Sequence, residues 1–163
     1  MKKILSILFL SVLTYSCSNQ QTGTAVVKDS DELSLNAKSL LQAYFDNDFS
    51  LWEELFSEDC EVFITNNAMD KKATIEALKQ ERALFNSFSV LDDYSHTNYF
   101  NNGDTWTNHW FIVNATGKFT GETNTVRVHT DLKWENGKVV IFQVYRDPSV
   151  TMKEATAMAE MSK

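Results

Sequence analysis

The sequence is poor in the residues that break or cross-link a chain: its 163 residues include one proline, five glycines and two cysteines. So little proline and glycine excludes a collagen-like or low-complexity chain. The sequence also lacks the CxxC and HExxH motifs and a glycine-rich phosphate loop, which are minimum patterns for thioredoxin-like, zinc-protease and nucleotide sites. It therefore predicts no cofactor and no metal site.

Basic residues are fewer than acidic ones, 15 against 22, so the formal net charge is -7. Nucleic-acid-binding proteins usually carry a basic patch, so this charge argues against a nucleic-acid partner. It also gives the folded part no attraction to an anionic membrane surface, and attachment to a membrane would require a lipid. Hydrophobic residues make up 43% and aromatic residues 12% of the chain, which is enough to fill a core and leave rings over.

The N-terminus carries a targeting signal. After two lysines, an almost continuous apolar stretch runs from Ile4 to Leu13, and Ser16 precedes Cys17. An apolar stretch of about ten residues is too short to cross a hydrocarbon core as a helix, so it indicates a signal peptide. The segment resembles a bacterial lipoprotein signal peptide, which would be removed to leave Cys17 as the lipidated first residue. The alternative is an ordinary secretory signal cleaved nearby.

This signal sets the expected organisation and location. Residues 1–16 are the expected signal peptide, residues 17–33 the lipidated cysteine and a flexible polar spacer, and residues 34–148 one folded domain. Residues 149–163 are expected to be a C-terminal tail or a frayed helix. The protein is then anchored by its lipid in the bacterial cell envelope, with the outer membrane as the expected membrane and a free secreted form as the alternative.

Cys60 has no intrachain partner if Cys17 is acylated. It lies between Asp59 and Glu61, whose negative charges raise the pKa of a thiol and make it less reactive. Buried free cysteine behaves as a small hydrophobic residue. Cys60 is therefore predicted to be structural rather than nucleophilic.

The first part of the folded domain has the period of amphipathic helices, with one short strand. The expected elements are a helix from the N-cap Ser34 to Phe45, a helix over residues 51–56, a strand over residues 61–65, a turn at Asn66-Asn67, and a helix from the N-cap Asp70 to about Phe88.

From residue 90 onward the hydrophobic period changes to that of strands. Four strands are expected, at about 90–100, 105–116, 124–134 and 138–146. Asn102-Gly103 and Asn136-Gly137 lie between alternating runs, which is a strong signal for hairpins. Consecutive hairpins make an antiparallel meander, so the predicted class is α+β with helices on one face of the sheet.

Two stretches of this pattern resemble a known family. Residues 43–56 (AYFDNDFSLWEELF), followed by residues 58–63, look like the opening of SnoaL-like domains of the nuclear transport factor 2-like superfamily. Residues 134–140, continuing to Asp147, are similar to the terminal hairpin of that family and its trailing aspartate. The resemblance covers roughly residues 34–148. It implies a cone-shaped fold, in which a strongly curved, mainly antiparallel sheet packs against three helices and leaves a pocket. Family members include cyclases, isomerases, hydrolases and pure binding or dimerisation domains, so the fold does not define the activity.

The strand at 124–134 divides its side chains between two faces. Val126, Val128, Leu132 and Trp134 share one face, and Arg127, His129, Asp131 and Lys133 share the other. A carboxylate beside a histidine raises its pKa and orients the ring, as a general acid or base requires. Solvent-facing strands carry the same charged pattern. The resemblance favours a site, because members of that family line their cavity with sheet residues.

The register of the last hairpin decides what faces His129. A two-residue loop at Asn136-Gly137 would put His129 opposite Val144, whereas a three-residue loop with a glycine bulge would put it opposite Gln143. The second register gathers a polar cluster on one face: Arg127, His129, Gln143 and Tyr145. It is favoured because the alternative mixes Val140, Phe142 and Val144 with charged residues.

These patterns leave three hypotheses. The first is an exported, lipid-anchored domain that binds a small, mostly apolar ligand carrying an acceptor or acid group. Its expected ligand-binding residues are Trp52, Trp106, Trp110, Arg127, Gln143 and Tyr145, with His129 as a second polar anchor. For Trp106 and Trp110 the alternative is a role in the core or in a dimer interface.

The second hypothesis is an acid/base enzyme, an isomerase, cyclase or hydrolase. His129 would be the general base, oriented by Asp131 or by Asp147, and Arg127 would stabilise an oxyanion. Asp147 is a candidate for this role because it matches the trailing aspartate of the family that the sequence resembles. The third hypothesis is an interaction domain whose exposed sheet face forms a homodimer.

Overall fold

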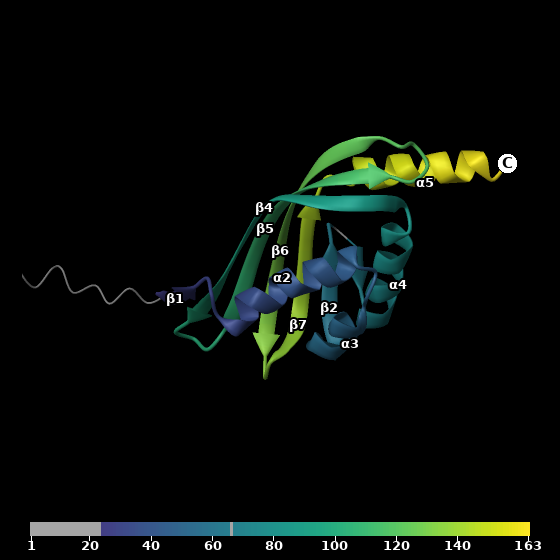
Figure 1. Ribbon diagram of the computed structural model, residues 1–163. Coiled ribbons are helices and arrows are strands. Elements are labelled where there is room, and N and C mark those ends of the chain that lie inside the picture. Colours follow the sequence, from purple (N-terminus) through teal and green to yellow (C-terminus); the bar gives the residue numbers. More distant parts are fainter. Residues whose placement is uncertain (1–23, 66) are drawn as a thin grey trace, which may run out of the picture.

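The computed structural model describes residues 24–65 and 67–163 (Figure 1). The expected signal peptide, Cys17 and Asn66 of the expected turn lie outside these residues. In chain order the elements are β1 (Ala25–Lys28), α2 (Glu32–Phe45), α3 (Ser50–Leu55), β2 (Phe56–Ile64), β3 (Asn67–Met69), α4 (Lys71–Arg82), β4 (Phe85–Phe100), β5 (Thr105–Gly117), β6 (Thr123–Glu135), β7 (Lys138–Arg146) and α5 (Ser149–Met161). None of the helices in this described part is long and apolar enough to cross a membrane.

The strands form one sheet in the order β1-β4-β5-β6-β7-β2-β3. Neighbouring strands are antiparallel except for β2 and β7, which are parallel. Helices α2, α3 and α4 lie against one face of the sheet, while α5 extends beside the bent ends of the long strands (Figure 1). The predicted α+β class with a mainly antiparallel sheet is confirmed.

The N-cap of the first helix, α2, lies three residues before the expected one. The carboxylate of Asp31 accepts a hydrogen bond from the backbone N–H of Ser34 at 3.1 Å, so Asp31 is the N-cap. Ser34 is fully buried, and its hydroxyl lies 2.9 Å from the hydroxyl of Thr97 on β4. The expectation for Ser34 was wrong because both residues are good N-caps and only burial distinguishes them.

Helix α4 begins as expected but ends earlier. The side chain of Asp70 accepts from Ala73 N at 2.7 Å, which confirms the predicted cap. The helix ends at Arg82 rather than near Phe88, because Phe85 already opens β4. A bulge just after Phe85 turns Phe85 and Phe88 to the same face of the sheet. Because these two rings are three residues apart in the sequence, their spacing resembles the hydrophobic period of a helix.

Both ends of the folded part are more ordered than expected. Residues 17–33 were predicted to form a flexible spacer, but Ala25–Lys28 form β1, which pairs with the end of β4. Two adjacent valines give this short run its tendency to form a strand. At the other end, α5 occupies nearly all of the segment expected to be a tail or a frayed helix.

The β6–β7 hairpin follows neither expected register. Asn136 and Gly137 have φ angles of 51° and 75°, as a two-residue turn of this type requires. Trp134 pairs with Val139, but a bulge between Lys133 and Trp134 then shifts the pairing, and His129 lies opposite Tyr145. The favoured three-residue loop was therefore wrong, since the extra residue lies in the strand and not in the turn.

The main core lies between the sheet and helices α2 to α4. Trp52 is 5% exposed, stacks on Phe56 at 5.0 Å between ring centroids, and donates from its indole nitrogen to Leu40 O at 3.1 Å. Cys60 is 2% exposed in the same core, and burial raises the pKa of its thiol to about 12. The thiol therefore stays protonated, and Cys60 is the structural residue that its neighbours predicted.

Candidate functional site

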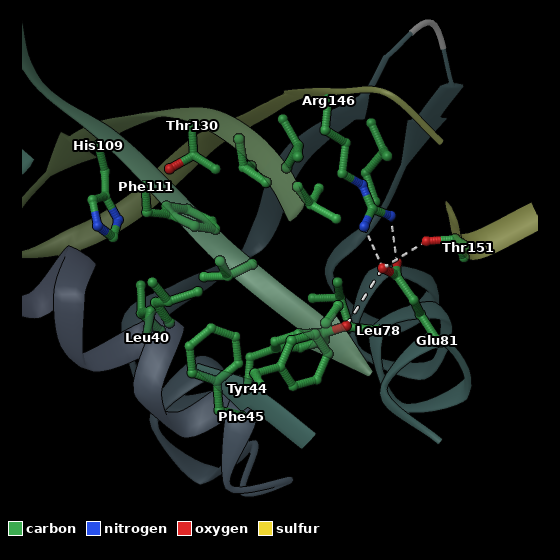
Figure 2. A pocket seen from close by; sticks show the side chains of 18 of the residues that line it. Leu40, Tyr44, Phe45, Leu78, Glu81, His109, Phe111, Thr130, Arg146 and Thr151 are labelled. Carbon is green, nitrogen blue, oxygen red and sulfur yellow. Dashed lines mark hydrogen bonds and ion pairs between the residues drawn. The ribbon is translucent and has the colours of Figure 1, made fainter. Parts of the chain in front are cut away.

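A cavity of about 100 Å³ lies between the helix-covered face of the sheet and helices α2 and α4, with the start of α5 at its rim (Figure 2). Its walls are mostly apolar and include Leu40, Phe45, Leu78, Phe111, Val128 and Phe142. An apolar cavity of about 150 Å³ is large enough to bind benzene. The present cavity encloses less volume than that and is open at its rim, so a molecule of one small ring would fill it and extend to the rim.

An ion pair lies at one end of the cavity. Arg146, the last residue of β7, donates from both terminal nitrogens to the two carboxylate oxygens of Glu81 on α4 (Figure 2). The hydroxyls of Thr151 and Tyr44 lie 3.3 Å and 3.4 Å from the same oxygen of Glu81 and donate to it. The side chains of Glu81 and Arg146 are 11% and 19% exposed, so the pair is largely desolvated.

The environment fixes the protonation of this cluster. Burial alone would lower the pKa of Arg146, but the hydrogen bonds and the negative charge of Glu81 raise it, and the guanidinium stays charged. Burial, together with the charge of Glu81, raises the pKa of Tyr44. Its phenol therefore stays protonated and acts as a donor.

A buried histidine lies in the wall of the cavity further along the sheet (Figure 2). His109 on β5 is 2% exposed, and its Nε2 lies 2.6 Å from the carboxylate of Asp93 on β4. Lys38 on α2 holds Asp93 in turn, with its Nζ 3.5 Å from the carboxylate and 3.1 Å from the backbone oxygen of Asp93. Thr130, directly opposite His109 on β6, is also buried in the cavity wall.

His109 is neutral near pH 7. Burial lowers the pKa of the imidazole, and the carboxylate of Asp93 offsets this only in part. A neutral ring beside a carboxylate donates from Nε2, so Nδ1 keeps its lone pair. The pair can therefore orient a base, which is the chemistry that the sequence placed at His129.

The alternation of residues along β5 contains part of the signal for His109. Along β5 it is in phase with Phe111, Val113 and Ala115, which are buried, so alternation alone places it on the inner face. Its partner Asp93 precedes it by a whole hairpin and is not directly opposite it, because Ser95 pairs with His109 and Asp93 pairs with Phe111. Sequence reasoning therefore missed the pair.

Most of the expected site residues lie on the opposite face of the sheet. Pairing places Trp106, Trp110, Arg127, His129, Asp131, Gln143 and Tyr145 together on the face that the helices do not cover. Of the residues that were expected to form the site, only Trp52 and Asp147 line the cavity. The expectation that the polar face of β6 forms the pocket is thus corrected: the cavity forms on the apolar face, because that face is covered by helices.

The expected partners of His129 are separated by the sheet. Its Nε2 lies 2.9 Å from the carboxylate of Asp131 without forming a hydrogen bond to it, and Asn108 donates to that carboxylate. Asp147, in contrast, accepts from Ser149 N at 2.9 Å at the start of α5, on the cavity side. A role of His129 and Asp131 in catalysis stays a prediction.

The uncovered face carries a row of stacked rings, which we call the outer ladder: Tyr94, His96, Trp110, His129 and Tyr145. The ring centroids of Trp110 and His129 are 4.6 Å apart with an interplanar angle of 12°. Tyr94, Trp110 and Tyr145 remain 51%, 39% and 49% exposed. Among the residues that the structure describes, no group of three or more His, Cys, Asp or Glu side chains could hold a metal ion.

Comparison of the sequence with protein-family models found no match, and comparison with curated proteins found none either. Solved structures do match. Wild-type IdmH, a candidate polyketide cyclase from Streptomyces antibioticus, has a TM-score of 0.58 and 13% identity, covering 77% of this chain and 99% of its own. A nuclear transport factor 2-like superfamily protein from Salmonella enterica has a TM-score of 0.59 and 13% identity, covering 71% and 88%.

A candidate polyketide cyclase from Silicibacter has a TM-score of 0.57 and 12% identity, covering 78% of this chain and 97% of its own. At such low identity these likenesses establish the fold and nothing finer. The chain has the nuclear transport factor 2-like fold, and the fold expected from residues 34–148 is confirmed.

Proposed function

We propose that this nuclear transport factor 2-like domain binds a small, mostly apolar molecule in the cavity between the sheet and helices α2 and α4. The observation that carries the proposal is an apolar cavity with a few polar groups at fixed positions, notably His109, Thr130 and the Glu81–Arg146 pair. This is the usual composition of a small-molecule site, in which apolar walls supply affinity and polar groups supply orientation.

Native mass spectrometry of the protein purified from a bacterial periplasm tests this proposal. We expect a mass excess that disappears on denaturation. Val128→Phe, which fills the cavity, should abolish it, while Ile112→Phe on the uncovered face should not. Absence of any excess, together with no binding of a small cyclic hydrocarbon or ketone, would contradict the proposal.

A second candidate function is general acid/base catalysis at the same cavity. The 2.6 Å contact between Asp93 and the neutral, buried His109 supports it, because this arrangement presents an oriented base in an apolar wall. The test is exchange of the α-hydrogens of cyclohexanone in D2O, followed by NMR. Exchange above the buffer rate that is lost in His109→Gln and reduced in Asp93→Asn supports the enzyme, whereas exchange at the buffer rate rejects it.

We also propose that the protein is exported and anchored by a lipid on Cys17. The support is the apolar stretch over residues 4–13 with Ser16 and Cys17 after it. Cys17→Ala should move the protein from the detergent phase to the aqueous phase in a phase-separation assay. If the unaltered protein already partitions into the aqueous phase, the secreted form is supported instead.

The outer ladder supports a further proposal, that two copies of the chain associate through their uncovered sheet faces. Exposed aromatic rings are common in interfaces, and three are gathered here.

A further inference from the structure

We propose that the cavity selects neutral molecules with a carbonyl oxygen, namely small ketones, esters or amides, over carboxylates, amines and plain hydrocarbons. This inference rests on the proposed binding function and names the ligand class of the same cavity. It follows from the N–H donors of Arg146 that Glu81 does not use and from the charges around them.

Arg146 has hydrogen-bonding capacity beyond its ion pair. A guanidinium carries five N–H donors in a planar fork. Within the described residues, Glu81 is its hydrogen-bond partner, through one N–H from each terminal nitrogen. Because the side chain of Arg146 is largely buried and lines the cavity, an acceptor oxygen on a ligand can take one of the remaining donors.

The charges around Arg146 act against an anionic ligand. The carboxylate of Glu81 already neutralises the guanidinium, and it is largely buried. A ligand carboxylate at Arg146 would therefore lie close to the carboxylate of Glu81 in a poorly solvated site. A carbonyl oxygen accepts the same hydrogen bond without that repulsion.

The site is no better suited to a cationic ligand. Both oxygens of Glu81 already accept from Arg146, and one also accepts from Thr151 and Tyr44. An ammonium group at this end would have to approach the positive charge of Arg146, while the carboxylate of Asp147 is exposed to solvent, which screens its attraction. At the other polar group, His109 is neutral and Asp93 is already paired with Lys38, so no free charge is available there.

Four probes that each have seven non-hydrogen atoms separate these alternatives: cyclohexanone, methylcyclohexane, cyclobutanecarboxylate and cyclohexylammonium. Their binding is followed by NMR titration of the purified protein at neutral pH. We expect cyclohexanone to bind roughly tenfold more tightly than methylcyclohexane, the effect of one hydrogen bond to a charged donor. Both charged probes should bind at least roughly tenfold more weakly than cyclohexanone.

Two substitutions assign the selectivity to the ion pair. Glu81→Gln leaves the charge of Arg146 uncompensated, so cyclobutanecarboxylate should gain roughly tenfold or more in affinity. Arg146→Met removes the donors, and the advantage of cyclohexanone over methylcyclohexane should disappear. Lys153→Met is the matched control: it removes the cation of the Lys153–Glu122 pair, which does not line the cavity, and should change neither ratio.

The outcomes distinguish this inference from the function on which it rests. If no probe binds, the proposed binding function is contradicted. If the carboxylate or the hydrocarbon binds as tightly as cyclohexanone, the cavity binds ligands but the selection of neutral carbonyl compounds is wrong. Should the two variants not fold, the order of the four probes on the unaltered protein still decides.

Discussion

At the scale of the single residue, Gly117 matters for the side chain it lacks. A β-carbon at this position would lie 2.0 Å from a carboxylate oxygen of Glu154 on α5. That carboxylate is buried and accepts hydrogen bonds from Phe119 N at 2.9 Å and from the hydroxyl of Thr120. We expect Gly117→Ala to displace the carboxylate and to lower the free energy of unfolding by about 1–3 kcal/mol, measured by urea denaturation.

A double-mutant cycle isolates this contact. In a Glu154→Ala background the carboxylate is gone, so Gly117→Ala should have little effect. An equal loss of stability in both backgrounds would show that the substitution acts through the backbone and not through Glu154.

His109 predicts a pH dependence of stability. Burial lowers the pKa of the folded imidazole below its ordinary value of 6.5. Between the lowered pKa of the folded protein and the ordinary pKa of the unfolded chain, the unfolded chain binds more protons than the folded protein. The free energy of unfolding therefore falls as the pH drops below 6.5, and His109 does not affect it at higher pH. Urea denaturation at intervals from about pH 7 to about pH 5 should show a steeper fall for the unaltered protein than for His109→Gln. His96→Gln, on the uncovered face, should retain the steep fall.

At the scale of the element, α4 depends on its N-cap. Asp70 satisfies the N–H of Ala73 at 2.7 Å, and the same helix carries Glu81 into the cavity wall. Replacing Asp70 by Ala should reduce the free energy of unfolding by about 1 kcal/mol, whereas Asp70→Ser, which keeps an acceptor, should cost less. Equal losses for the two variants would contradict the capping role.

The elements also show which structural features local sequence patterns can predict. Three of the four long strands match their expected bounds to within one residue, and the Asn136-Gly137 turn lies where it was expected, because alternation and turn residues act over a few neighbours. The exception is β4, which begins five residues earlier than expected, at Phe85. The bulges after Phe85 and beside Trp134 were not predictable in this way. A bulge is set by which side chains the opposite strand and the helices must bury, and that information lies far away in the sequence.

At the scale of the whole molecule, the uncovered sheet face makes a prediction about assembly. If two copies associate through the outer ladder, Trp110→Ala should shift the protein from dimer to monomer in sedimentation velocity experiments, because it removes the central ring. Leu35→Ala, which alters an exposed apolar residue on α2, should leave the dimer intact. A monomer for the unaltered protein at all concentrations would contradict the proposed association.

The sequence by itself determined the α+β class, the order of most elements, the structural role of Cys60 and the division of β6 into a polar and an apolar face. Each of these depends on residue type and on the spacing of near neighbours. It also supplied the expectation of export through its first seventeen residues.

Only the tertiary structure decided which face of the sheet holds the cavity. The pattern of β6 is the same whether its polar face meets solvent or a ligand, and the helices on the apolar side settle the matter. It also brought together Asp93 with His109, and Glu81 with Arg146, pairs that are 16 and 65 residues apart. Such contacts depend on how strands and helices pack against each other, and the hydrophobic period of a single element does not predict that packing.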